Sequence, residues 1–164
     1  MARAYGWNAQ LLIAEENEYG VPPEENYWKI PFISSSLDSE QNLVSSNVLG
    51  LGRDPTQPFQ DVINVDGDMA VPVDMRNIGL WLKAVFGAPA TTDNEDGSFT
   101  HTFDSGKTSV PSYSLEVGLP EIPQFIRFSG VRANSIAFNF QRSGEAQATI
   151  NLMAQGESGS ETAI

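Results

Sequence analysis

The 164-residue chain carries 21 acidic and 9 basic side chains, a formal net charge of −12, and it contains no cysteine. The length is that of one domain with a real core, and the absence of cysteine excludes disulfides and thiolate metal sites. The basic residues stand singly, which argues against a nucleic-acid-binding module, because gripping a phosphate backbone takes clustered lysine and arginine. No stretch reaches the roughly 20 apolar residues of a membrane span, and we expect no membrane partner and no cleaved signal peptide.

The first third of the chain predicts two strands and a long loop. Strands are expected at 9–15 and 27–34, the second at an edge or a bulge because of Pro31. Residues 34–60 are rich in serine, glycine and proline, and loops of that length are usually functional or become ordered on a partner. The alternative for this segment is a short strand at 42–49 between flexible flanks.

The next stretch predicts a strand and then a helix. Apolar and polar residues alternate at 61–73, as in a half-buried strand interrupted near Gly67. A helix is expected at 75–86, with the Asp74 carboxylate as its N-cap and Gly87 at its end. Because so short a helix is not stable alone in water, it is expected to pack on a sheet as a lid. Its core-facing residues share one stripe at helical spacing: Ile78, Trp81, Leu82 and Val85.

The second half predicts a series of short strands. An Asp96–Gly97 turn indicates a hairpin, and the returning strand and its successors are expected at 99–103, 113–119, 125–130, 135–140 and 145–155. Such spacing indicates a sandwich or barrel, so the fold class is all-β with one flanking helix, built from two packed antiparallel sheets in a single domain over 1–155. We assign Phe125, Phe128, Phe138 and Phe140 to the core, and 156–164 to a polar tail with nothing to bury.

Signals for catalysis or metal binding are weak. The single histidine, His101, lies between threonines near a turn, and a hydrogen-bonded surface histidine is favoured there over a catalytic base. The acidic groups at 64–68 and 93–97 lack the ligand number and spacing of a calcium loop. We therefore expect no enzyme, no metal and no cofactor. A monomeric ligand-binding β-sandwich and a hydrolase built on two carboxylates are the alternatives from other classes.

Four stretches occur in an informative order: "EYGVPP" (18–23), "GRDP" (52–55), "VDGDMAVPVDMRNIGLWLKAVFG" (65–87) and "FSGVRANSIAFNF…EAQATINLMAQGE" (128–157). In this order the chain resembles the tail tube proteins of long-tailed bacteriophages. The resemblance covers most of the chain, and the order of the pieces carries it rather than any single motif. Many members are longer, so the chain is either a complete short member or one that lacks a C-terminal part.

The resemblance implies two antiparallel sheets packed face to face, flanked by one helix, which join into a ring-wide β-barrel in stacked hexameric rings. The implied partners are other copies of the chain and the tape measure, terminator, and baseplate or tip proteins of the tail. Genome DNA is expected to pass through the channel without specific binding. The implied location is the virion, after synthesis in the host bacterial cytoplasm. The alternative within this class is a tube, terminator or baseplate protein of a contractile injection or type VI secretion system.

The net charge has two interpretations: ordinary solubility, or a surface that must not bind a polyanion. On the second, Asp66, Asp68 and Glu116 are the channel-facing candidates, because they occupy polar faces of expected strands. Asn139, Gln147 and Asn151 fit the same role. The resemblance implies that the long loop reaches the neighbouring ring, and its candidate contacts are Leu43, Val48, Leu49, Leu51 and Arg53.

Overall fold

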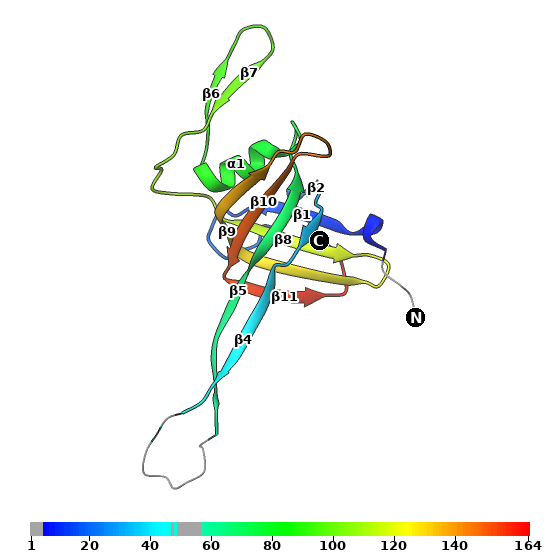
Figure 1. The fold of residues 1–164 in the computed structure, drawn as a ribbon, viewed down its shortest axis with the longest axis vertical. Coiled ribbons are helices and arrows are strands. Elements are labelled where there is room, and N and C mark those ends of the chain that lie inside the picture. Colours follow the sequence, from blue (N-terminus) through cyan, green and yellow to red (C-terminus); the bar gives the residue numbers. More distant parts are fainter. Residues whose placement is uncertain (1–4, 47, 49–56) are drawn as a thin grey trace.

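The fold is a strongly curved antiparallel sheet with one flanking helix, which confirms the predicted fold class. The computed structural model describes residues 5–46, 48 and 57–164. Within these ranges it contains a short 3-10 turn, η1 (Gly6–Asn8), eleven strands and one α-helix (Figure 1). The elements are β1 (Gln10–Glu15), β2 (Trp28–Ile30), β3 (Ser34–Ser35), β4 (Asp38–Val44), β5 (Phe59–Pro72), α1 (Ile78–Phe86), β6 (Ala90–Asp93), β7 (Phe99–Thr102), β8 (Tyr113–Leu119), β9 (Gln124–Asn139), β10 (Gln147–Ala154) and β11 (Gly156–Ser160).

Strand β9 belongs to both halves of the curved sheet. Up to Val131 it pairs with β8 and with β11, and from Arg132 onward it pairs with β10. The first half-sheet therefore runs β2–β1–β8–β9–β11, and the second runs β9–β10–β5, with β3 and β4 both paired along the far side of β5. Strands β6 and β7 form a separate two-stranded sheet.

The corner between the half-sheets is fixed at Gly130. Its φ is +64°, a conformation that favours glycine, and a Cβ placed there would lie 2.7 Å from Cβ of Gln155. Gln155 joins β10 to β11 and donates its N–H to the carbonyl oxygen of Ser129. Two neighbouring strands thus turn the same corner together, and this wraps the sheet around the core.

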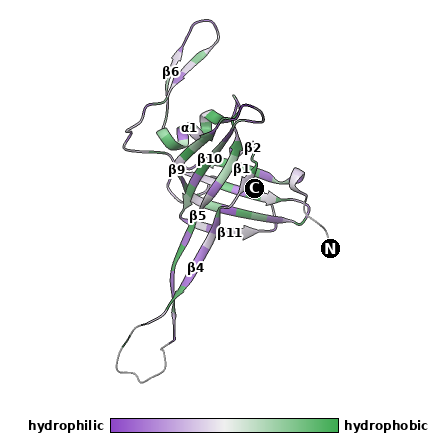
Figure 2. Ribbon diagram, viewed as in Figure 1, coloured by the Kyte–Doolittle hydropathy of each residue, from purple (hydrophilic) through white to green (hydrophobic). Residues whose placement is uncertain are grey.

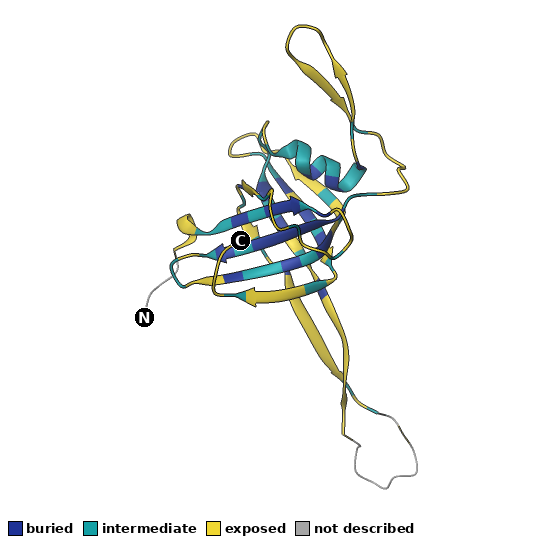
Figure 3. Cartoon of the chain, turned by 180° about the vertical axis from the view of Figure 1, so that it is seen from behind, coloured by how far each residue is buried: buried dark blue, intermediate teal, exposed yellow. Residues whose placement is uncertain are grey.

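The core lies between the half-sheets and under α1. Side chains that alternate along β5, β10 and β9 meet those of β1, β8 and α1. The fully buried ones include Leu11, Ile13, Met69, Val71, Trp81, Leu115, Phe128, Val131, Ile150 and Leu152. Figure 3 shows this band of buried residues across the middle of the molecule, with exposed hairpins at either end.

Helix α1 packs beside β9 as the predicted lid, but its buried face differs from the predicted stripe. Trp81 and Ala84 are buried, and Ile78 and Leu80 pack on the core cluster. Leu82 and Val85, which the sequence assigned to the stripe, are only half-buried and lie outside that cluster. A contact face that includes the small Ala84 lets the helix approach the sheet closely.

The start of the helix is later than predicted, and the reason lies in its cap. Asp74 Oδ1 accepts the backbone N–H groups of Arg76 (2.7 Å) and Asn77 (2.8 Å), so the predicted capping carboxylate is present. It closes a turn over 75–77, and the regular helix begins at Ile78 rather than at residue 75. The helix ends as predicted at Gly87, whose φ is +83°.

The segment 34–60 is not the long loop that its composition predicted. Strand β4 pairs with β5 to form a hairpin that projects from one end of the molecule, while the β6–β7 hairpin projects from the other (Figure 1). We call the first hairpin the arm (described residues 38–46, 48 and 57–64). The backbone ladder holds the arm together although its side chains face solvent, which is why composition alone suggested irregular structure. The predicted Asp96–Gly97 turn joins β6 to β7, with Gly97 at φ +85°.

Two further expectations are wrong. Residues 156–160, assigned to a free polar tail, form β11 and pair with β9 from Ser129 to Phe125. Its glycines and serines bury little, so no hydrophobic pattern reveals a strand held by backbone hydrogen bonds. Phe138 and Phe140, assigned to the core, are exposed because β9 runs beyond the core, whereas Phe125 and Phe128 are buried as expected.

Candidate assembly surfaces and channel face

The second half-sheet has one broad side that faces away from the core, which we call the polar face. Its cross-strand register aligns Asp66 with Asp38 and Met153, and the next rows continue through Asp68 with Asn151. The members of the polar face are Asp38, Glu40, Asn64, Asp66, Asp68, Ala70, Gln147, Thr149, Asn151, Met153, Arg132, Asn134, Ser135, Ala137 and Asn139. Small neutral polar and acidic groups therefore make up most of this surface.

Side-chain amides cross-link the polar face in its middle. Asn151 donates its Nδ2–H to Oδ1 of Asp68 (2.9 Å), and Asn134 donates to Oδ1 of Asn151 (3.0 Å). Gly67, between the two aspartates, is needed because residues 36 and 37 cross β5 here, and a Cβ would lie 2.4 Å from the carbonyl oxygen of Ser36. Strand β5 nevertheless runs unbroken from Phe59 to Pro72 and pairs with β10 through Gly67, so the interruption predicted near Gly67 is wrong.

Positive charge is scarce on the polar face. Among the described residues of β3, β4, β5, β10 and the second half of β9, Arg132 is the only lysine or arginine. Its guanidinium lies over the ring of Tyr19, 4.7 Å from the ring centroid, at the corner of the sheet. The middle of the face thus offers carboxylates and amides to solvent and no cation.

The structure places two of the three acidic candidates on this face. Asp66 and Asp68 are exposed on neighbouring rows of β5. Asn139, Gln147 and Asn151 lie on the same side of the sheet. These five residues, all named from alternation along the expected strands, form one surface, and their position relative to a channel stays a prediction.

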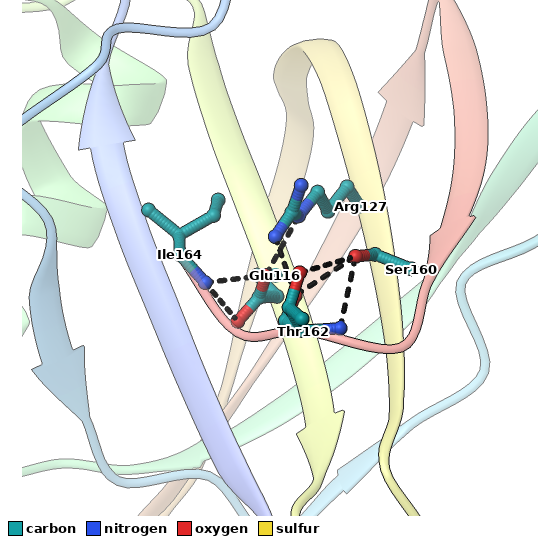
Figure 4. A network of polar contacts seen from close by, with 5 residues as sticks. All are labelled: Glu116, Arg127, Ser160, Thr162 and Ile164. Carbon is teal, nitrogen blue, oxygen red and sulfur yellow. Dashed lines mark hydrogen bonds and ion pairs between the residues drawn. The ribbon is translucent and has the colours of Figure 1, made fainter.

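Glu116, the third acidic candidate, does not belong there. It lies on β8 in the other half-sheet and has an exposed fraction of 0%. Its Oε2 accepts from Nε of Arg127 at 2.8 Å, and its carboxylate also accepts the backbone N–H of Ile164 (Figure 4). Arg127 in turn donates to the carbonyl oxygen of Thr162. Because its own chain covers this carboxylate, the expectation that Glu116 lines a channel is wrong.

A second buried carboxylate was not identified from the sequence. Glu16 Oε1 accepts from the Ser114 hydroxyl (2.7 Å) and from the backbone N–H of Gly130 (2.8 Å), and Oε2 accepts the N–H of Gly20. It ties the end of β1 to β8 and to the corner of β9. Local sequence holds no signal for this, since its partners are up to 114 positions away.

The arm carries exposed apolar side chains. Leu43 and Val48, two of the five candidates for contact between rings, are exposed on it; Leu49, Leu51 and Arg53 lie outside the described residues. The sequence analysis did not single out Phe59, Val62 and Ile63, which are also exposed there because β5 extends beyond the core. Figure 2 shows hydrophobic and hydrophilic residues mixed along the arm.

Outside these surfaces, the described part of the chain contains no cluster of side chains suited to catalysis or metal binding. His101 is exposed and its Nδ1 forms a hydrogen bond with the Thr91 hydroxyl (2.8 Å), as expected of a surface histidine. Within the described ranges no group of three histidine or acidic side chains is placed to hold a metal ion. The hydrogen bonds from Asn77 hold the pKa of Asp74 below its ordinary value, and burial raises the pKa of Tyr113.

The fold and these surfaces define a class: a β-rich structural subunit with projecting hairpins and a broad polar sheet face. The family model described as phage tail tube protein matches residues 6–163, and the chain belongs to this family. Its members are structural proteins of phage tails, which confirms the resemblance noted in the sequence. No helix in the described ranges is long and apolar enough to cross a membrane.

Solved structures share the fold at low sequence identity. A chain of the 6-fold symmetrised anti-feeding prophage (AFP) baseplate is 10% identical, with a TM-score of 0.59 over 97% of this chain and 96% of that one. The SPP1 tail tube protein is 10% identical, with a TM-score of 0.55 over 96% and 78% of the two chains. A chain from the C6-symmetric tail of an empty GTA particle is 15% identical, with a TM-score of 0.54 over 98% and 100%. No curated protein sequence matches the chain significantly.

Proposed function

We propose that this chain forms hexameric rings that stack into a tail tube, with the polar face lining a channel for genome DNA. The observation that carries the proposal is the polar face itself, in which carboxylates and small neutral groups cover a broad exposed surface with a single cation at its corner. Phosphate groups bind proteins chiefly through lysine and arginine. A surface with this composition repels a polyanion and lets it slide.

The edges of the second half-sheet support ring closure. In the described ranges, no strand pairs with β9 beyond Val131 on the side opposite β10, and β3 with β4 forms the other edge. Exposed strand edges tend to pair with other chains, and a closed barrel leaves none. Joining the β9 edge of one copy to the β3–β4 edge of the next would make one ring-wide barrel. The six-fold symmetry of the AFP and GTA assemblies supports six copies.

The arm is the proposed contact between rings. It projects past the core with Leu43 and Val48 exposed, and apolar groups held in solvent favour burial against a partner. Leu49, Leu51 and Arg53 complete this candidate surface by sequence. The tape measure, terminator, and baseplate or tip proteins remain the proposed partners at the ends of the tube.

A second candidate is a tube, terminator or baseplate subunit of a contractile injection system. The specific observation in its favour is the fold similarity to the AFP baseplate chain and to a chain of the PVC sheath-tube complex, the latter with a TM-score of 0.53 at 14% identity. The two candidates share self-assembly and differ in cargo. DNA recovered from particles that contain the assembled chain would favour the phage tail, and binding of a sheath protein to tubes would favour the injection system.

The direct test is assembly of the purified protein. Electron microscopy of the concentrated chain should show rings or rods of even width with a central channel, and sedimentation should show rod mass rising with concentration. A chain that stays monomeric at millimolar concentration would contradict the proposal. It would favour the monomeric ligand-binding sandwich.

A further inference from the structure

Exposed apolar side chains occur at both ends of the second half-sheet. Strand β5 runs from Phe59 in the arm to Pro72, which pairs with Gln147 at the start of β10. Strand β9 ends there too, because Asn139 pairs with the same Gln147. The arm is therefore one end of the sheet, and the β9–β10 connection is the other, which we call the distal end (Figure 1).

The distal end carries an aromatic pair. Phe138 lies opposite the buried Ala148, so it is on the core-facing side of the sheet. Its ring stacks on that of Phe140, with centroids 5.8 Å apart and planes within 6°. The exposed fractions are 42% for Phe138 and 70% for Phe140. Two stacked rings with this exposure form an apolar platform at the end of the core.

The arm exposes apolar groups on both of its faces. Gln41 pairs with Ile63, and Leu43 lies two residues further along β4, so Leu43 and Ile63 share the face that continues the core-facing side. Val62 precedes Ile63 and so continues the side of the polar face. The pairing of β4 with β5 shifts register between Gln41 and Leu43, so that Phe59 pairs with Val44 and comes to the same side as Val62. Val62 is 73% exposed. The arm is therefore apolar on both faces, and either face is a candidate for burial against a neighbouring copy.

We propose that Phe59 and Val62 of one copy pack on the Phe138–Phe140 platform of the next copy in the stack. The inference rests on the proposed function, because it assumes that copies stack along their strands. Such stacking keeps the orientation of the sheet faces, so an arm can overlap the next copy in two ways. On the core-facing side, Phe59 and Val62 meet the platform. On the polar side, Leu43 and Ile63 would be buried against amides and hydroxyls such as Asn139 and Thr149, which desolvates polar groups without partners.

Charge is consistent with the first arrangement. The charged side chains in the described part of the arm are all acidic: Asp38, Glu40 and Asp61. Arg142 is exposed two residues beyond Phe140, with Glu145 at the far side of the same connection.

The arm and the Phe138–Phe140 platform are different surfaces at opposite ends of one molecule. The contact is therefore heterologous and continues as an open stack instead of closing after two copies.

Thiol cross-linking tests the contact directly, because the natural chain has no cysteine. Copies with Val62→Cys are mixed with copies carrying Phe140→Cys, assembled, and treated with a short bismaleimide. We expect a cross-linked dimer in rods and none in dilute monomer. The matched control replaces the second protein by Thr149→Cys, whose thiol lies on the polar face. Rods that cross-link Val62→Cys to Thr149→Cys, or that give no Phe140→Cys product, would overturn the inference and leave the proposed function standing.

A substitution series provides the second readout. Val62→Asp should raise the critical concentration for rods at least about tenfold, since it places a charge in an apolar contact. Val62→Thr, which is close in shape, should assemble with a much smaller change. Because Val62 is exposed in the subunit, both variants should unfold at the same temperature as the parent chain. Rods of Val62→Asp that form at the parent concentration would refute the contact, whereas failure of the parent chain to form rods would refute the proposed function as well.

Discussion

At the scale of single residues, the carboxylates show what alternation along a strand can and cannot reveal. Asp66, Asp68 and Glu116 all occupy the polar positions of alternating strands. The first two are exposed, but Glu116 lies on β8, between β1 and β9, where Arg127 and the chain around Ile164 cover it. The sequence predicts which side of a strand a residue occupies, but whether that side is covered depends on segments far away in the chain.

Trp81 tests the placement of the helix lid. It is 2% exposed within the core cluster, so Trp81→Ala should lower the free energy of unfolding by about 3–5 kcal/mol through lost contacts and a cavity. For a domain of this size each kcal/mol shifts the melting temperature by roughly 2–4 °C. Calorimetry measures the shift. Leu82→Ala, at a half-buried position outside the core cluster, should cost clearly less, and equal effects would show that the helix faces are assigned incorrectly.

Asp74 gives a prediction for pH. Its pKa is lowered by hydrogen bonds from Asn77, so its charged form is favoured in the folded state. The stabilisation is therefore present above the unfolded pKa and is lost as pH falls through the lower folded value. Asp74→Asn should be slightly less stable than the parent at pH 7 and equal to it at low pH, where acid and amide both offer one carbonyl oxygen. A stability difference in urea titrations that did not shrink on acidification would contradict this.

At the scale of elements, short-range patterns predicted most of the sheet. The helix, the Asp96–Gly97 hairpin and most strands of the core follow from periodicity and turn residues that the chain carries locally, although the two strands expected at 125–130 and 135–140 are one continuous strand, β9. The arm and β11 did not, because backbone ladders hold them and their side chains bury little. The residues of the polar face could be predicted for the same reason as those of the core, because alternation with a period of two separates the side chains on the two sides of a strand. Its assembly from β5, β9 and β10 depends on register, which no local pattern specifies.

The corner of the sheet can be tested with two glycines that lie close together. Gly130→Ala would force a side chain into a left-handed conformation, with its Cβ 2.7 Å from Cβ of Gln155 and 3.1 Å from the Tyr19 ring. We expect a loss of about 1–3 kcal/mol or more in chemical denaturation. Gly156→Ala is the control, because its Cβ would meet only the Ser129 hydroxyl at 3.7 Å. Similar losses for both variants would mean that the corner does not depend on Gly130.

At the scale of the whole molecule, the net charge does not show where the charged side chains lie. The net charge of −12 is compatible with plain solubility, and acidic side chains also occur on the β6–β7 hairpin, far from the polar face. The polar face combines exposed carboxylates with a near absence of cations among its described residues, which is the arrangement that the second interpretation predicts. Because a channel needs several copies, the proposed role of this face as a channel lining is tested on assemblies.

Asp66→Lys combined with Asp68→Lys reverses the charge at the centre of the polar face. Both side chains are exposed in the subunit, so the double variant should fold and form rods, with only the Asn151 hydrogen bond to Asp68 lost. If this face lines the channel, each ring then presents clustered lysines to DNA, and clustered lysines bind phosphate in a salt-dependent way. Rods of the variant should retain short DNA at low salt and release it at high salt, and particles built with it should eject their genome more slowly.

The control Glu24→Lys with Glu25→Lys makes the same charge change at exposed positions away from this face and should behave like the parent. If the control retained DNA as strongly, net charge alone would explain the result; if the variant ejected its genome normally, Asp66 and Asp68 would lie outside the channel.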